Sequence, residues 1–134
     1  MTTKRSPSKG EVETAIRNAV IKFEQEFLGQ GPEDVRAFIA KDVVMVRLDE
    51  VQTPAERQLT RTPEGSEMVR RIGRTLFVQG REQLCRQLDD ITGARTIGLF
   101  TDIDTQLGER IIVLTLDRDL ESVLAKREAS GTIG

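Results

Sequence analysis

The sequence predicts a single α+β domain of two layers, in which helices cover a mostly antiparallel four-stranded sheet. Three observations lead to this prediction. The chain has 134 residues, which suits one domain built around one apolar core. Segments with apolar residues at helical spacing alternate with short segments rich in β-branched residues. These short segments come in pairs joined by a turn, which is the pattern of two hairpins.

A first helix is expected over about residues 10–28. Ser8 and Glu11 have the spacing of a capping box, in which each side chain bonds the backbone of the other residue. Gly29 and the Gly31-Pro32 pair end the helix, because glycine accepts a left-handed cap and proline cannot continue a helix. Apolar residues recur between these signals at helical intervals, namely at Val12, Ile16, Ala19, Val20, Phe23 and Phe27.

A hairpin and a short second helix are expected next. Residues 35–39 alternate apolar and other side chains, and residues 43–48 form an apolar run that is too short for an ordinary helix. The segment 53–56 then combines an N-cap threonine, a proline at the first helical position and a glutamate at the third. The second helix is therefore predicted to begin here.

The longest expected element is a third helix that follows Pro63 and ends at Gly93. Gly73 and Gly80 lie on its apolar stripe one heptad apart, although glycine in a helix interior costs ~1 kcal/mol relative to alanine. Two interpretations remain open: the glycines let another backbone approach closely, or Gly80 marks a break between two shorter helices. A long stripe in a small protein also favours a partner helix. We therefore expect a homodimer with Gly73, Leu76 and Gly80 at its interface.

A second hairpin and a closing helix complete the expected elements. The strands cover residues 96–102 and 110–116 around a turn at 105–108, and the helix lies near residues 119–127. The order helix, hairpin, helix thus occurs twice. We expect residues 9–128 to form the domain, with flexible ends over residues 1–8 and 129–134.

Composition argues against several kinds of partner and site. The formal net charge is −2 with acids and bases interspersed, so the positive field of a nucleic-acid-binding protein is missing. The absence of histidine removes His-based triads and zinc sites. Cys85 is the single cysteine, so no intrachain disulfide can form and a cytoplasmic, reducing compartment is expected. No stretch approaches the ~20 apolar residues of a membrane span, so we expect no direct membrane insertion and any membrane link to run through a partner.

The candidate ligand-binding residues lie around the second hairpin and in the first. Asp102 and Asp104 point to the same side of an extended strand, and Glu109 returns across the turn. Such carboxylates could hold Mg²⁺ or Ca²⁺, although solvated turn residues are the commoner explanation. Arg47 ends an apolar strand, where a guanidinium could grip bicarbonate or phosphate, and Arg110 lies beside Glu109. We assign no catalytic residue, no metal and no cofactor, because no phosphate loop or nucleophile with its base is present.

A series of short motifs runs in a fixed order through residues 9–121, nearly the whole chain. The motifs are Phe27-Leu28-Gly29-Gln30-Gly31-Pro32, Val35-Arg36, Val44–Leu48, Thr53-Pro54-Ala55-Glu56, Ile91-Thr92-Gly93, and Thr105–Arg110 leading into Val113–Leu116. In these motifs the chain resembles the MpsC-like family, which was long catalogued as a domain of unknown function. The resemblance implies a soluble accessory of a membrane-potential-generating or inorganic-carbon transport system, and it brings no established active site.

The leading interpretation is a non-enzymatic accessory or regulatory subunit that binds a cytoplasmic partner, such as a membrane transport subunit, in a bicarbonate or cation transport system. The alternative is a small-anion or nucleotide sensor that uses Arg47, Arg110 and the carboxylates of the second hairpin. An enzyme is the weakest alternative, because it would depend on carboxylates alone.

Overall fold

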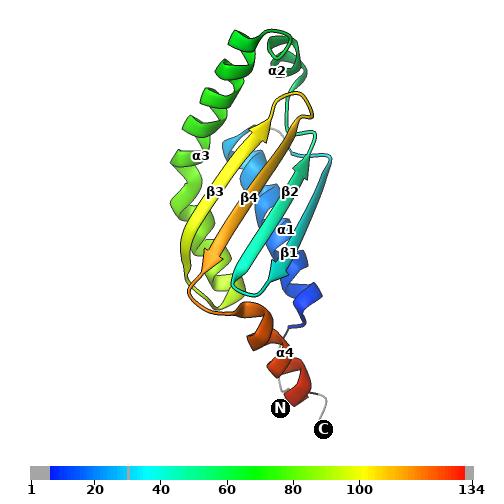
Figure 1. Ribbon diagram of the computed structural model, residues 1–134, viewed down its shortest axis with the longest axis vertical. Coiled ribbons are helices and arrows are strands. Elements are labelled where there is room, and N and C mark those ends of the chain that lie inside the picture. The colour runs from blue at the N-terminus through cyan, green and yellow to red at the C-terminus, as the bar shows by residue number, and fades with distance from the viewer. Residues whose placement is uncertain (1–6, 30, 132–134) are drawn as a thin grey trace.

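The protein is described by a computed structural model that covers residues 7–29 and 31–131. The expected flexible residues 1–6 and 132–134 lie outside this description. The described elements, in chain order, are α1 (Lys9–Phe27), β1 (Asp34–Ala40), β2 (Val43–Asp49), α2 (Pro54–Leu59), α3 (Pro63–Thr92), β3 (Thr96–Asp104), β4 (Glu109–Leu116) and α4 (Leu120–Gly131) (Figure 1).

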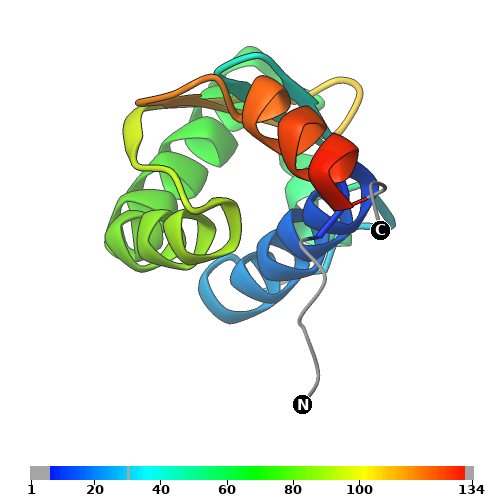
Figure 2. The same cartoon turned by 90° about the horizontal axis from the view of Figure 1, so that it is seen from below.

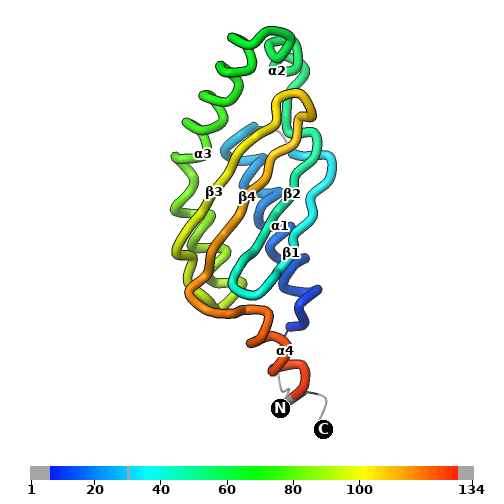
Figure 3. Tube along the Cα trace, viewed as in Figure 1, coloured from blue at the N-terminus to red at the C-terminus, as the bar shows by residue number. Residues whose placement is uncertain are grey.

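The strands form one sheet in the order β1-β2-β4-β3, so the two hairpins lie side by side with β2 next to β4 (Figure 3). All three neighbouring pairs are antiparallel. Helices α1 and α3 lie against one face of the sheet, and no described helix covers the other face (Figures 1 and 2). The predicted α+β class with a four-stranded antiparallel sheet is therefore confirmed.

The two predicted capping boxes are both present. At α1, the Glu11 N–H donates to Ser8 Oγ (3.1 Å), and the Ser8 N–H donates to Glu11 Oε1 (3.4 Å). At α2, the Glu56 N–H donates to Thr53 Oγ1 (3.1 Å), and the Thr53 N–H donates to Glu56 Oε1 (3.0 Å). These bonds satisfy backbone donors that the first helical turn leaves open, so each helix begins where the sequence predicts.

Helix α3 is continuous through Gly80, which excludes a break between two shorter helices there. A Cβ at Gly80 would lie 2.8 Å from the ring of Phe27, and one at Gly73 would lie 3.2 Å from Nη2 of Arg110. The close approach at both glycines is made by side chains of the same chain, whereas the first interpretation placed another backbone there. The helix ends at Gly93, whose φ of 71° is the left-handed cap that glycine accepts without strain.

The core lies between the helical layer and the inner face of the sheet. Alternate residues of the central strands are fully buried there, namely Val44, Val46 and Leu48 of β2 and Ile112, Leu114 and Leu116 of β4. Helix α4 runs to Gly131, so residues 129–131 are helical where a flexible end was expected. Among the described helices, none has both the length and the apolar character needed to cross a membrane.

Candidate functional site

The acidic residues predicted around the second hairpin are bound to nearby backbone. The Asp104 carboxylate accepts from the N–H groups of Gln106 and Leu107 (2.9 and 3.1 Å), which holds the turn closed. The Asp102 carboxylate accepts from the N–H of Ile103 (2.8 Å). Within the described part of the chain, no group of three or more acidic or cysteine side chains is placed to hold a metal ion.

The two predicted arginines point to opposite faces of the sheet. Arg47 pairs in register with Ile111, the neighbour of Arg110, and successive strand residues alternate between faces. On the uncovered face, Nη2 of Arg47 lies 3.0 Å from a carboxylate oxygen of Glu109. On the inner face, Arg110 enters the core. A single small anion therefore cannot be gripped by both guanidinium groups.

Arg110 instead meets Glu24 of α1 inside the protein. The two residues are 5% and 1% exposed, and Nε of Arg110 lies 3.3 Å from Oε1 of Glu24. Gly73 of α3 faces the guanidinium, since a Cβ there would lie 3.2 Å from Nη2 of Arg110. Three elements therefore meet at this ion pair. Helix α1 carries Glu24, strand β4 carries Arg110, and α3 leaves room for the guanidinium because Gly73 has no side chain.

The hydrogen bonding of this buried pair is incomplete. Glu24 Oε2 and Arg110 Nε have no hydrogen-bond partner among the described residues, so the 3.3 Å approach is an ion-pair contact without hydrogen-bond alignment. A cavity of about 20 Å³ adjoins the pair and is also lined by Glu56, Gly73 and Leu76. A space of this size holds about one water molecule.

Burial raises the pKa of the Glu24 carboxyl from its ordinary value of 4.5 to about 7, and the positive charge of Arg110 offsets this rise only in part. Glu56, the other acid beside the cavity, is held in the capping box of α2. Glu24 is thus placed to gain or lose a proton near neutral pH. Its arginine partner makes the pocket unsuitable for a metal cation.

Glu24 is the residue that sequence reasoning missed. It continues the line of Ile16 and Val20 at intervals of four residues on α1, so a charged side chain falls on the buried stripe. A glutamate on the buried stripe of a helix could have indicated a functional or paired residue, because a buried charge needs a partner. Of the residues predicted at a helix interface, Gly73 and Leu76 border this cavity, whereas Gly80 packs on Phe27. The expected homodimer itself stays a prediction.

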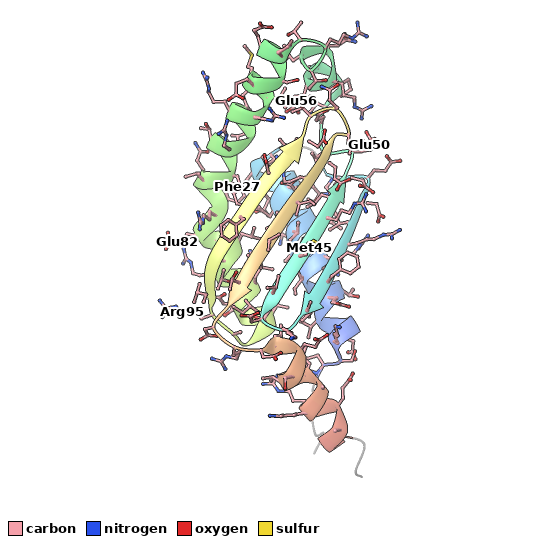
Figure 4. The ribbon with its side chains drawn as sticks, viewed as in Figure 1. Phe27, Met45, Glu50, Glu56, Glu82 and Arg95 are labelled. Atoms are coloured by element: carbon pink, nitrogen blue, oxygen red, sulfur yellow. The ribbon has the colours of Figure 1, made fainter. Side chains whose placement is uncertain are left out.

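A second feature of the structure is an apolar row across the uncovered face of the sheet. Phe38 pairs in register with Met45, Met45 pairs with Val113, and Val113 pairs with Phe100. The row therefore crosses all four strands, and Figure 4 shows Met45 on β2, one of the two central strands. Phe38 and Phe100, at its two ends, are 44% and 67% exposed. We call these four residues the apolar row.

Comparisons with known proteins place this fold in a family context. Residues 8–118 match the family model described as Na⁺-translocating membrane potential-generating system (MpsC). The chain is 33% identical to the uncharacterized protein YbcI of Bacillus subtilis (strain 168) over 119 residues, which cover 89% of this chain and 96% of that protein. It is 28% identical to the uncharacterized protein YrhF of the same strain over 108 residues, which cover 79% and 88%. No solved structure matches the chain.

Proposed function

The chain belongs to the MpsC family, described as a Na⁺-translocating membrane potential-generating system, and we propose that it is an accessory component of such a system that acts by binding a protein partner. The observation that supports this proposal most directly is the apolar row on the uncovered face of the sheet. The family points to a membrane potential-generating system, and the apolar row supports binding of a protein partner as the way in which the chain acts.

The apolar row is unusual for a sheet face that no helix covers. In antiparallel sheets with one covered face, the other face normally carries polar side chains. Here two phenylalanines, a methionine and a valine lie in one line across four strands, with Arg36 and Arg47 two residues further along β1 and β2. Phenylalanine, methionine and arginine are enriched in protein interfaces, and exposed apolar patches mark interaction sites.

The alternative function, a small-anion or nucleotide sensor, receives less support from the geometry. Arg47 is already paired with Glu109, and Arg110 is enclosed with Glu24. Neither guanidinium is therefore free in the described structure to meet an incoming anion.

The transported species is the narrower part of the proposal. The family is named for Na⁺ translocation, whereas bicarbonate is an expectation that derives from the resemblance in sequence motifs. We propose Na⁺ as the first ion to test and bicarbonate as the second.

The test is deletion of the gene in a bacterium that carries it, followed by measurement of membrane potential with a voltage-sensitive dye at several Na⁺ concentrations. Uptake of labelled bicarbonate is measured in the same cells. We expect the deletion to lower the Na⁺-dependent potential and the wild-type chain to restore it. A deletion that leaves both the Na⁺-dependent potential and bicarbonate uptake unchanged would refute the proposal.

Two variants separate the surface from the fold. Phe38→Glu places a charge in the apolar row, whereas Leu107→Glu introduces the same charge at a 66% exposed side chain in the β3–β4 turn. Both variants should fold, as checked by circular dichroism. Only Phe38→Glu should fail to restore the potential; equal restoration by both variants would rule out the apolar row as the functional surface.

A further inference from the structure

A groove lies between helix α3 and the edge strand β3. It has a volume of about 280 Å³ and is lined by Arg74, Phe77, Val78, Arg81, Leu99, Phe100 and Thr101. Phe77 and Leu99 are buried beneath it, while Val78 and Phe100 are 68% and 67% exposed at its sides. The groove therefore offers apolar contact to a further chain at one edge of the sheet.

The edge of β3 in this groove has backbone groups open to pairing. In the sheet order, β3 neighbours β4 alone, so its other side pairs with no described strand. The N–H of Ile103 donates to the Asp102 carboxylate, which shows that residue 103 faces the open edge. Backbone groups alternate along an antiparallel strand, so Leu99 and Thr101 face the same edge. Both of these residues line the groove.

The charge of the groove has one sign. Arg74 and Arg81 line it, and no carboxylate of the described residues does. Arg81 makes no ion pair with any other described residue. Arg74 pairs with Glu67 at 2.9 Å, and because both side chains are exposed, an incoming carboxylate would have to displace Glu67 to bind Arg74. A seven-residue interval on a helix spans about 10 Å, which an extended strand covers in three to four residues. Carboxylates four residues apart on such a strand point to the same side and would meet both arginines.

Thr101 adds a second sign of an open site. Its Oγ1 is buried and has no hydrogen-bond partner among the described residues. Most buried hydroxyl groups in proteins are hydrogen bonded, so this oxygen is an unsatisfied polar atom in a residue that lines the groove.

We propose that this groove binds an extended acidic segment of a protein partner, which pairs with β3 as a fifth strand and sets its carboxylates against Arg74 and Arg81. Addition of a strand to a sheet edge beside a helix is an established mode of peptide recognition. The added strand also extends the uncovered face next to Phe100. The proposal rests on the proposed function, because it specifies where the partner binds and by what chemistry.

The experiment selects binders without assuming a sequence. Random decapeptides displayed on phage are selected against the full chain, and synthetic copies are then measured by fluorescence anisotropy. We expect selected peptides to carry aspartate or glutamate at two positions four residues apart. Arg81→Glu should weaken their binding at least tenfold, whereas Arg86→Glu, an exposed arginine on α3 that does not line the groove, should change it less than twofold. Hydrogen exchange at the Leu99 and Thr101 amides should slow in the complex.

Several results would overturn the proposal. They are a selection without acidic enrichment, equal effects of Arg81→Glu and Arg86→Glu, or unchanged exchange at the β3 edge. Self-association of the chain that Arg81→Glu abolishes would identify a second copy as the occupant and would also overturn it. If Arg81→Glu restores the Na⁺-dependent potential in the deletion strain while Phe38→Glu does not, the proposed function stands and the groove proposal fails.

Discussion

Replacing Glu24 by glutamine should change how the stability of the protein depends on pH. Glutamine keeps the shape of the side chain and removes its titration. The wild-type carboxyl has a pKa of about 7 in the folded protein against an ordinary value of 4.5, because it is buried beside a single arginine. Between about pH 4.5 and pH 7, the Glu24 carboxyl is therefore mostly protonated in the folded state and mostly ionised in the unfolded chain. Stability must consequently fall as pH rises from about 4.5 to about 7.

The magnitude follows from the size of the pKa difference. A rise of this size in a fully buried group corresponds to about 3 kcal/mol of folding free energy, of which roughly 2 to 3 kcal/mol is lost between pH 5 and pH 8. The Glu24→Gln variant should not lose this stability, because glutamine does not titrate. The free energy of unfolding of the variant relative to wild type should therefore increase by roughly 2 to 3 kcal/mol over that range.

The assay is urea unfolding of both proteins at pH 5, 6.5 and 8. The difference between the two proteins at each pH is the quantity to compare, because contributions from other titrating groups largely cancel. Glu26→Gln, at an exposed position of the same helix, serves as the control and should differ from wild type by the same amount at every pH. A constant difference for Glu24→Gln as well would refute the reasoning, because it would mean that Arg110 keeps Glu24 ionised throughout.

Two further predictions concern packing and charge. Gly65→Ala should destabilise the protein by more than about 2 kcal/mol in urea unfolding, because the added methyl would overlap the backbone carbonyl of Leu59, whereas Gly10→Ala, with open space around it, should stabilise by up to ~1 kcal/mol. Arg110→Ala leaves Glu24 as an unpaired buried charge, so we expect a loss of about 3–5 kcal/mol at pH 8 and a smaller loss at pH 5, where the carboxyl is protonated. Equal losses of stability at the two pH values would contradict the second prediction.

Much of the fold was predictable because its signals act between residues that are close in the sequence. The capping boxes at Ser8 and Thr53 and the left-handed cap at Gly93 each depend on a few neighbouring residues. The hairpins follow in the same way from short β-branched segments joined by turns. The end of α4 was less predictable, because the residues after 127 carry no glycine or proline before Gly131 to stop the helix.

The candidate site was less predictable, because it depends on contacts between distant segments. The sequence indicates that Arg47 and Arg110 could each bind an anion, but the register of β2 on β4 places their side chains on opposite faces of the sheet. Likewise, Glu24 falls on an apolar stripe, yet the sequence pattern does not indicate which basic residue pairs with it in the core.

By itself, the sequence determined the class of fold, the start of each capped helix and the absence of histidine chemistry. Tertiary structure alone decided that Glu24 meets Arg110 in the space left by Gly73. It also decided that no described helix covers the second face of the sheet and that no described strand pairs with the outer edge of β3. The physical reason is the separation in sequence of the interacting residues. Caps and turns are set by hydrogen bonds between neighbouring residues, whereas burial of a charge depends on how distant helices and strands pack.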